Sequence, residues 1–446
     1  MGKYALILVG ALIFSVLTYS YALKNALFQS NTRTVQSFSQ NQAYNIAQSA
    51  AMVTINDIRN IGSSDFNPAF DETYTYPLDG GYASWDDMHG DYRVQVANQA
   101  DTLLVVQTIG RFEKSMHRAL VGLSMGTTFW NPTFDQALHA ENLIHPSGSV
   151  DISCVNDSPK CQVTINSINA GAIDVGGSST IDADLFIGPG GDPATVVNGE
   201  ENISGDINVM PARIDYPMPI FPDYSDLNFL SGSSVYNSTM TLQPNDYEQK
   251  HISEILMTSG NNTLTIDTGN QDREMRVGRL ELGGQNQINV VGEGKLTIYV
   301  DYDVDMKGGS SINKEGDVNN LMLYYKGNQD VELYDETLDF GGNTFFNGTF
   351  FADLATVRLQ GTAGIQGNVI TGGNIELSGD AEAISRVIYA PRGTVRTNGN
   401  TGIRGSVISN EFTGDGNVTL IYDQELGAEL PELEVIGGDF PIVYWN

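Results

Sequence analysis

The sequence has few of the residues on which most catalytic and nucleic-acid-binding sites depend. It contains two cysteines, five histidines and three tryptophans, and its 23 Lys+Arg face 54 Asp+Glu, for a net charge of −31. So acidic a surface repels phosphate backbones, and we expect no nucleic-acid partner. An ordinary solvated exterior accounts for this charge; adaptation to a salty medium or Ca²⁺ binding at the surface are the alternatives.

Catalytic and cofactor motifs are missing as well. No serine lies in a G-x-S-x-G elbow, and GPGGDP at 188–193 lacks the Lys-Ser/Thr of a phosphate-binding loop. No two histidines have metal-ligand spacing: His89, His117, His139, His145 and His251. We therefore predict no catalytic, cofactor-binding or metal-binding residues, and we expect that the protein is not an enzyme.

One acidic stretch needs separate treatment. DYDVD places Asp301, Asp303 and Asp305 on one face of an expected strand. Three aligned carboxylates are possible Ca²⁺ ligands or residues of a polysaccharide-cleaving site, but the stretch lacks the glycine and closing glutamate of an EF-hand. A solvated strand face is the favoured interpretation.

The two cysteines lie close together in SCVNDSPKC, as Cys154 and Cys161. The Asn, Asp, Ser and Pro between them favour a turn, so we predict a disulfide and hence an oxidising compartment. Two free thiols are the alternative. The spacing fits no zinc signature.

The first segment is apolar enough to span a membrane. Residues 4–23 carry no charge and are flanked by Lys3 and Lys24. Twenty helical residues cover roughly 30 Å, the thickness of a bilayer core. We predict a retained single-pass anchor with the rest of the chain exported. A cleaved signal peptide is the alternative, since SYA at 20–22 fits a cleavage site.

The helical pattern continues beyond the apolar run. Residues 25–60 contain no proline and place apolar residues near helical spacing, and Gly62 is a plausible stop. We predict a transmembrane helix that continues as an amphipathic helix over residues 1–62. It is a stalk, or a helix that packs in a filament or an inner-membrane complex.

Three β-like runs follow, at 91–99, 102–110 and 115–125, separated by turn residues. We predict that residues 63–128 form a small three-stranded meander packed on the helix.

A repeat of 19 residues dominates the C-terminal part. GIQGNVITG at 364–372, AISRVIYAP at 383–391 and GIRGSVISN at 402–410 share their apolar positions. Phe346, Phe350 and Phe351 continue all three columns one step earlier: Ile365, Ile384 and Ile403; Val369, Ile388 and Val407; Ile370, Tyr389 and Ile408. A fixed step of about 20 residues marks stacked repeats that bury a shared core.

Less regular repeats precede these. Ile181 and Leu185 match Ile203 and Ile207 at a step of 22. The proline-rich segment 211–223 predicts an extended crossover, because proline removes ladder donors. We expect an excursion near 224–260 with a helical piece at 244–260. The sequence thus predicts a parallel β-solenoid over 129–430 and a C-terminal strand or cap at 431–446, which pairs with the meander or seals one end of the stack.

The fold class is therefore mainly β: a long N-terminal transmembrane helix, a small α+β meander and a right-handed parallel β-solenoid, or β-helix. The start MGKYALILVGALIF resembles the membrane-anchoring start of minor pilin-like proteins of the PilX family. GKLTIYVDYDVDMKG, RVIYAPRGTVRTNG and the ending YDQEL resemble the solenoid domain attached to such anchors. Type IV pilins carry Glu at mature position five; cleavage after Gly2 would place Ile7 there.

The resemblance implies a structural, pilus-assembly or secretion-associated protein, with pilin-like or secretion-system partners and a possible role in surface adhesion. It implies an inner-membrane, single-pass protein whose bulk lies in the periplasm or at the cell surface. The alternative is an exported β-helix enzyme or binder of polysaccharide. Such a site would need basic residues, and the regular repeats contain one basic cluster: Arg386, Arg392, Arg396 and Arg404. A bactofilin-like polymer is disfavoured by the export segment.

Overall fold

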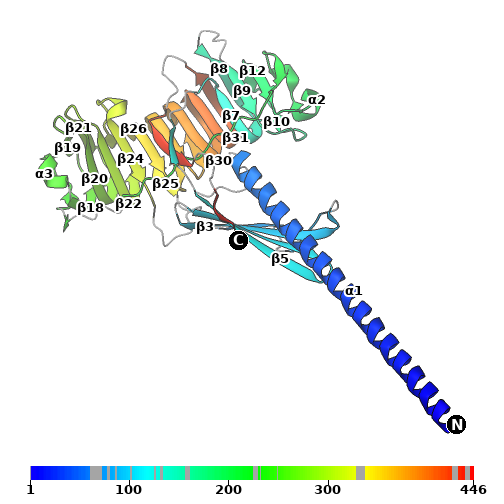
Figure 1. Ribbon diagram of the computed structural model, residues 1–446. Coiled ribbons are helices and arrows are strands. Elements are labelled where there is room, and N and C mark those ends of the chain that lie inside the picture. Colours follow the sequence, from blue (N-terminus) through cyan, green and yellow to red (C-terminus); the bar gives the residue numbers. More distant parts are fainter. Residues whose placement is uncertain are drawn as a thin grey trace. The chain divides into compact units, whose positions relative to one another are not determined.

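The structure is a computed structural model, shown in Figure 1. It describes residues 2–60, 73–77, 81–85, 88–100, 103–124, 127–130, 134–155, 161–224, 230–231, 233–248, 250–327, 337–423, 430–436 and 442–445. The chain divides into two compact units. We call residues 1–128 with 436–446 the helix–sheet unit, and residues 129–435 the stacked unit.

The helix–sheet unit combines one long helix with an antiparallel sheet. Helix α1 (Gly2–Asn60) is continuous, which confirms the long N-terminal helix. The sheet has the order β1-β3-β4-β5-β33, and β2 pairs with another part of β3. Its strands are β1 (Thr73–Tyr76), β2 (Ala83–Trp85), β3 (Gly90–Ala100), β4 (Leu103–Phe112), β5 (Ser115–Ser124) and β33 (Ile442–Trp445). The C-terminal tail therefore pairs with the meander, one of the two expected roles.

Alternation along the strands explains the core of this unit. Val94 and Val96 on β3, and Leu104 and Val106 on β4, point to one face and are buried, as expected for the period-two pattern of a half-buried strand. Together with Val121 and Leu123 they form one buried cluster with three residues of α1: Ala50, Ala51 and Ile55.

The chain passes from one unit to the other in β6 (Thr127–Trp130) and returns in β32 (Leu433–Ile436), which pair as a two-stranded sheet.

The stacked unit contains one parallel sheet of 25 strands, formed by two series of turns. The first series comprises β7 (Leu138–Pro146), β8 (Ser149–Cys154), β9 (Gln162–Ile165), β10 (Ile173–Asp174), β11 (Thr180–Ile181), β12 (Asp184–Ile187), α2 (Pro193–Val196), β13 (Val197–Asn198), η3 (Glu200–Asn202) and β14 (Ile207–Val209).

The second series begins with short strands at one end of the stack: β15 (Leu230–Ser231), β16 (Val235–Tyr236), β17 (Met240–Leu242), α3 (Pro244–Tyr247) and β18 (Lys250–Met257). It continues with β19 (Thr263–Asp267), β20 (Arg273–Leu282), β21 (Gln287–Val291), β22 (Leu296–Met306), β23 (Ser311–Ile312), η5 (Val318–Asn320), β24 (Leu321–Tyr325), β25 (Thr337–Phe340), β26 (Phe345–Ala352), β27 (Thr356–Leu359), β28 (Gly364–Thr371), β29 (Ile375–Gly379), β30 (Glu382–Arg404) and β31 (Ser406–Tyr422).

The order of the turns in space differs from their order in the sequence. Strands β18, β20, β22 and β24 pair in succession, so that each turn lies on the previous one. The last strand of the second series, β31, pairs with β7 and β8 of the first series. The chain thus enters the stack in its middle, builds outward to β14, crosses to the opposite end and returns to the place where it entered.

The register confirms two of the three predicted 19-residue columns. Phe350, Val369, Ile388 and Val407 lie opposite one another, as do Phe351, Ile370, Tyr389 and Ile408. All eight side chains are buried. The 22-residue step is confirmed too, because Ile181 lies opposite Ile203 and Leu185 opposite Ile207.

The first column is wrong at one position. Phe346 lies opposite Ile365 as expected, but Ile365 lies opposite Ala383, and Ile384 lies opposite Gln366. A register shift between Gly367 and Asn368 restores the other two columns. The extra residue of this bulge displaces Ile384 from the predicted ladder.

The excursion expected near 224–260 is wrong, although a short helical piece is present in it. Residues 244–260 contain only one helical turn, α3, and then enter β18, while β15 to β17 pair with β18 and β19. Because Pro244 opens α3 and β18 carries Ile252, Ile255 and Met257 at buried positions, this segment belongs to the stack.

Glycines form one corner of the stack. Gly342, Gly361, Gly379 and Gly399 have φ of 80°, 73°, 80° and 92°, and a Cβ on Gly361 would lie 2.9 Å from the oxygen of Gly342. Only glycine adopts this conformation without strain at so close an approach. The column continues from Gly416 of the last turn to Gly148 of the first, across the join of the two series.

Candidate functional site

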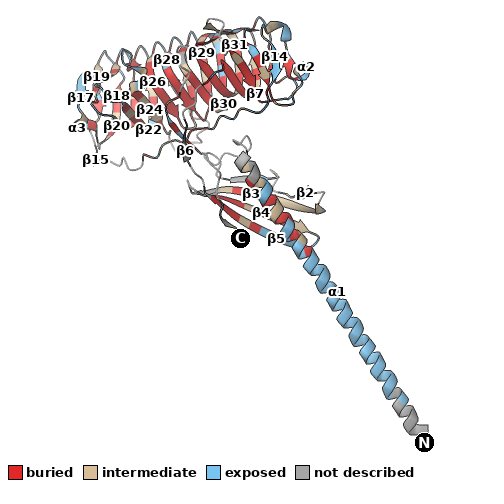
Figure 2. Cartoon of the chain, turned by 45° about the horizontal axis from the view of Figure 1, so that its top comes forward, coloured by how far each residue is buried: buried red, intermediate tan, exposed pale blue. Residues whose placement is uncertain are grey.

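Helix α1 exposes apolar side chains on every side over the part of its N-terminal half whose side chains the structure describes. Figure 2 shows the change along the helix, from exposed toward the N-terminus to buried where it meets β4 and β5. Among the described side chains, those of 9 and 11–38 are exposed, including Leu12, Phe14, Leu17 and Phe28. Within residues 11–55 the helix is long and apolar enough to cross a membrane.

The second half of α1 is bound closely to its sheet. Ala43, Ile46, Ala47 and other small or aliphatic residues are buried. A Cβ on Gly110 would lie 2.4 Å from the backbone of both Ala43 and Ala47, so only glycine permits this approach. The Thr108 hydroxyl donates to the oxygen of Ala47 at 2.7 Å. The exposed half therefore extends from a firmly packed base.

The stacked unit carries an aromatic column on the outside of its strands. Tyr299, Tyr324 and Phe351 lie opposite one another on β22, β24 and β26, and the rings of Tyr299 and Tyr324 stack at 5.3 Å. The column continues through Ile370, Tyr389 and Ile408 to His139 on β7.

The proline-rich crossover covers this column, and we call residues 211–224 the strap. Tyr216 contacts His139 and Tyr389, while Phe221 lies 5.4 Å from Phe351. Tyr224 stacks on Tyr299 at 4.9 Å. Eight extended residues reach roughly 25 Å, enough to cross four inter-strand steps of about 4.8 Å. The strap thus ties together turns that the sequence separates.

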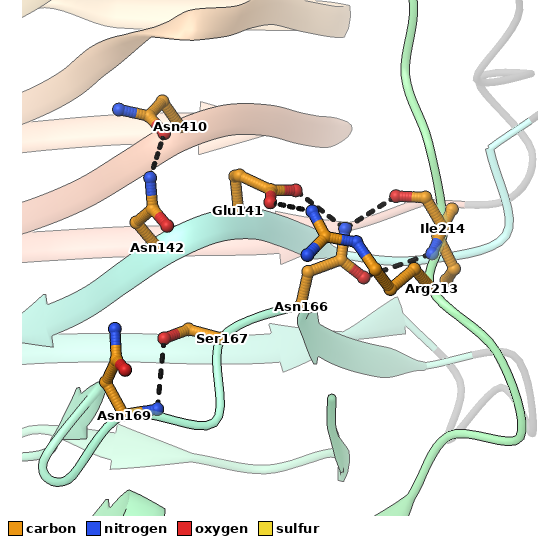
Figure 3. A network of polar contacts seen from close by, with 8 residues as sticks. All are labelled: Glu141, Asn142, Asn166, Ser167, Asn169, Arg213, Ile214 and Asn410. Carbon is orange, nitrogen blue, oxygen red and sulfur yellow. Dashed lines mark hydrogen bonds and ion pairs between the residues drawn. The ribbon is translucent and has the colours of Figure 1, made fainter. Parts of the chain in front are cut away.

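A polar network holds the first part of the strap (Figure 3). Asn166 is buried; its amide donates to Glu141 and to the oxygen of Ile214, both at 2.7 Å, and its own oxygen accepts the Ile214 amide at 3.0 Å. Arg213 pairs with Glu141. Nearby, the Asn142 amide donates to the Asn410 oxygen at 2.7 Å, across the join between β7 and the last turn.

Asp301 forms the corresponding cluster at the far end of the strap. It is 7% exposed, accepts from Arg276 Nε at 3.1 Å and lies 3.1 Å from His251 Nε2. The Arg276 guanidinium lies over the Tyr224 ring. Asp305 pairs instead with Lys307. Asp301 and Asp305 thus have separate cationic partners, and the described residues contain no group of three His, Cys, Asp or Glu that could hold a metal ion.

The five histidines are not brought together in the described part of the chain. His139 is the buried one; its Nδ1 lies 2.7 Å from the Thr164 hydroxyl, and burial lowers its pKa to about 3. His145 pairs with Asp174 and His251 with Asp301, while His117 contacts Tyr44 on α1.

The arginines considered for a polysaccharide site also have separate surroundings. Arg404 pairs with Asp423, and Arg386 donates to Asn319 at 2.9 Å. Arg396 lies opposite Glu376, which already pairs with Arg358. Contacts of this kind are those expected of arginines that stabilise neighbouring turns of the stack.

Cys154 ends β8, and its Cα atom lies 5.8 Å from that of Cys161, a separation that suits the predicted disulfide.

The sequence signals for the docking of the strap are weak: Tyr216, Phe221 and Tyr224 lie among prolines with no period. The only hint was that apolar side chains occur in a segment that cannot be a strand.

Comparisons with known proteins complete this description. A family model described as a domain of unknown function, DUF7305, matches residues 251–382 and 371–429, which make up less than half of the chain. No curated protein matches. Among solved structures, the chain is similar to the competence-associated pilin ComZ from Thermus thermophilus at 12% identity, over 92% of this chain and 97% of that one, with a TM-score of 0.19. At that score the similarity carries no argument about this protein.

Proposed function

We propose that this protein is a non-enzymatic, membrane-anchored structural component of a pilus-like or secretion-associated assembly, which presents the stacked unit outside the cytoplasmic membrane. The observation that carries the proposal is the division of α1. One uninterrupted helix is packed on a sheet in its second half and exposes apolar side chains all round over residues 11–38.

An apolar helix surface of this kind needs an apolar environment. Leaving it in water costs about 25 cal/mol for each Å² of apolar surface, so a membrane or the helices of neighbouring subunits are the environments that suit it. Residues 4–23 are the proposed span, with Lys3 and Lys24 at its ends.

We further propose that the stacked unit is a right-handed parallel β-solenoid serving as a rigid body for assembly or surface contact. The successive pairing of turns and the buried columns through Val369 and Ile370 support the solenoid. Right-handedness is proposed because parallel strands joined by crossovers are right-handed in nearly all proteins.

The proposed location outside the cytoplasm rests on the two cysteines. A disulfide between Cys154 and Cys161 is expected to persist in an oxidising compartment.

Cell fractionation combined with the mass of the mature N-terminus tests the proposal. We expect the protein in the inner-membrane or sheared-filament fraction, beginning at Met1 or, after prepilin-type cleavage, at Lys3. A soluble product that begins near Leu23 would show a cleaved signal peptide and overturn the anchored structural role. Deleting residues 4–23 should release the protein from that fraction, whereas substituting Arg33 by Ala, a matched change on the same helix, should not.

A further inference from the structure

The last residues of the chain complete a core that its first residues begin. Tyr444 and Trp445 of β33 lie opposite Gly122 and Val121 of β5. Trp445 packs against the cluster that includes Ala51 and Ile55 of α1. All of residues 129–435 stand between these segments in the sequence. The helix–sheet unit is therefore closed by a strand that arrives only after the stacked unit.

The stacked unit is thus an insertion in the helix–sheet unit, and the segment by which the chain enters it is hydrogen-bonded to its last turn. Tyr422 Oη donates to the oxygen of Phe134 at 3.0 Å, Ser406 Oγ to that of Gln136 at 2.7 Å, and the Val407 amide to that of Ala137 at 3.0 Å. These bonds join the last turn to the segment that leads into the first.

The segment that leaves the stack is fixed as well. The Ile220 amide of the strap donates to the oxygen of Glu434 at 2.7 Å, and Pro219 bridges Val435. Leu430, Leu433 and Val435 are buried. In the folded stacked unit, both ends of the insertion therefore have defined places: the last turn fixes the entry segment, and the strap fixes the exit segment.

We propose that the stacked unit acts as a folding-dependent clasp: the helix–sheet unit closes with β33 only when the stacked unit has folded. The physical reason is loop closure. The probability that chain ends meet falls as roughly the −3/2 power of loop length, so an unfolded insertion of about 300 residues closes about 160-fold less often than a loop of about 10. Folding of the insertion removes this penalty, because it fixes both ends.

The closure of the helix–sheet unit would then depend on whether the stacked unit has folded. A chain whose stacked unit misfolds leaves the β5 edge without its partner, and an unpaired strand edge invites wrong pairing and removal. This inference does not depend on the proposed function, because it concerns only chain connectivity and contacts within each unit.

Hydrogen exchange on the full-length protein in detergent micelles tests the clasp. The double variant Val369→Asp/Ile388→Asp places two carboxylates in one buried column and should unfold the stacked unit. We then expect the β5 amides opposite β33 to exchange on the order of 100-fold faster. Gln366→Asp, an exposed change on the same strand as Val369, is the control and should leave both units protected.

A second full-length variant separates loop closure from other causes. Positions 122 and 444 lie opposite each other on β5 and β33. The double variant Gly122→Cys/Tyr444→Cys should therefore form a disulfide that tethers β33 to β5. In the double-aspartate background, this cross-link should restore β5 protection while the stacked unit stays unfolded. Unchanged β5 protection in the double-aspartate variant would overturn the proposal, as would a loss that the cross-link does not repair.

Discussion

The hydroxyl of Tyr422 donates a hydrogen bond to the backbone oxygen of Phe134, 288 residues earlier in the chain, and the bond is buried. Tyr422 ends the last strand of the stack, and Phe134 precedes the first. This bond is thus one of those that close the circuit of the chain through the stacked unit.

Replacing Tyr422 with Phe keeps the ring and removes this bond. We expect a loss of about 1 kcal/mol in the free energy of unfolding, with an added cost for the unpaired Phe134 oxygen. Denaturant titration of the full-length protein in detergent measures it. Tyr302→Phe, at an exposed tyrosine of the same unit, should change the free energy of unfolding by a few tenths of a kcal/mol at most. Equal losses in the two variants would refute the role given to Tyr422.

The buried columns predict a contrast between neighbouring residues. Ile388 is fully buried in the confirmed column, so Ile388→Ala should cost about 2–5 kcal/mol. Gln366→Ala, at an exposed position of the adjacent turn, should cost less than about 0.5 kcal/mol. Thermal unfolding followed by circular dichroism distinguishes them. Equal melting temperatures for the two variants would show that the column does not contribute to stability.

The glycine corner predicts strain on adding one methyl group. At Gly361, φ is 73° and a Cβ would lie 2.9 Å from the Gly342 oxygen. Gly361→Ala should therefore cost more than about 1 kcal/mol, although the position is exposed. Denaturation midpoints provide the measurement, and Gly341→Ala, where a Cβ meets nothing within 4 Å, is the matched control.

His139 predicts a loss of stability in mild acid. Burial lowers its pKa from 6.5 to about 3, so the folded state holds the ring neutral while the unfolded state takes up a proton below pH 6.5. The stabilising contribution is present above pH 6.5 and declines as the pH falls toward 3, by about 2 kcal/mol at pH 5. His139→Gln should lack this decline when denaturation is compared at pH 7.5 and pH 5.

Asp353 gives stability the opposite pH dependence from His139. Burial raises its pKa from 3.8 to about 6, against a smaller opposing effect of Lys326. Its contribution is greatest below pH 3.8 and is lost as the pH rises through 6, up to about 3 kcal/mol. Asp353→Asn should therefore gain stability relative to wild type between pH 4.5 and 7.5. A constant difference between the two proteins across this range would contradict the assignment.

Sequence patterns revealed the fold where the turns are of equal length. The 19-residue steps identified the columns through Val369 and Ile370 because each turn repeats the same apolar positions. The prediction of an excursion at 224–260 is wrong because the strands there are two to eight residues long and carry no fixed step. The displacement of Ile384 needed knowledge of a bulge, which depends on how neighbouring turns fit.

The candidate sites were less accessible from the sequence. The continuity of α1 followed from composition, since no proline interrupts residues 2–60. The docking of Tyr216, Phe221 and Tyr224 could not be inferred, because their partners lie on turns up to 173 residues away in sequence, such as Tyr389. The periodicity of neighbouring residues does not predict which strands a crossover segment will contact on the outside of the stack.

The strap also sets a rule for how such a molecule changes in length. Each layer added beneath it between Tyr299 and Tyr389 raises the span by about 4.8 Å, which calls for about one and a half more residues of extended strap. Layers gained beyond β14 make no such demand. Layers can therefore be added at that end without a change in the strap. Growth under the strap requires two coordinated insertions at distant points of the gene, one in the stack and one in the strap.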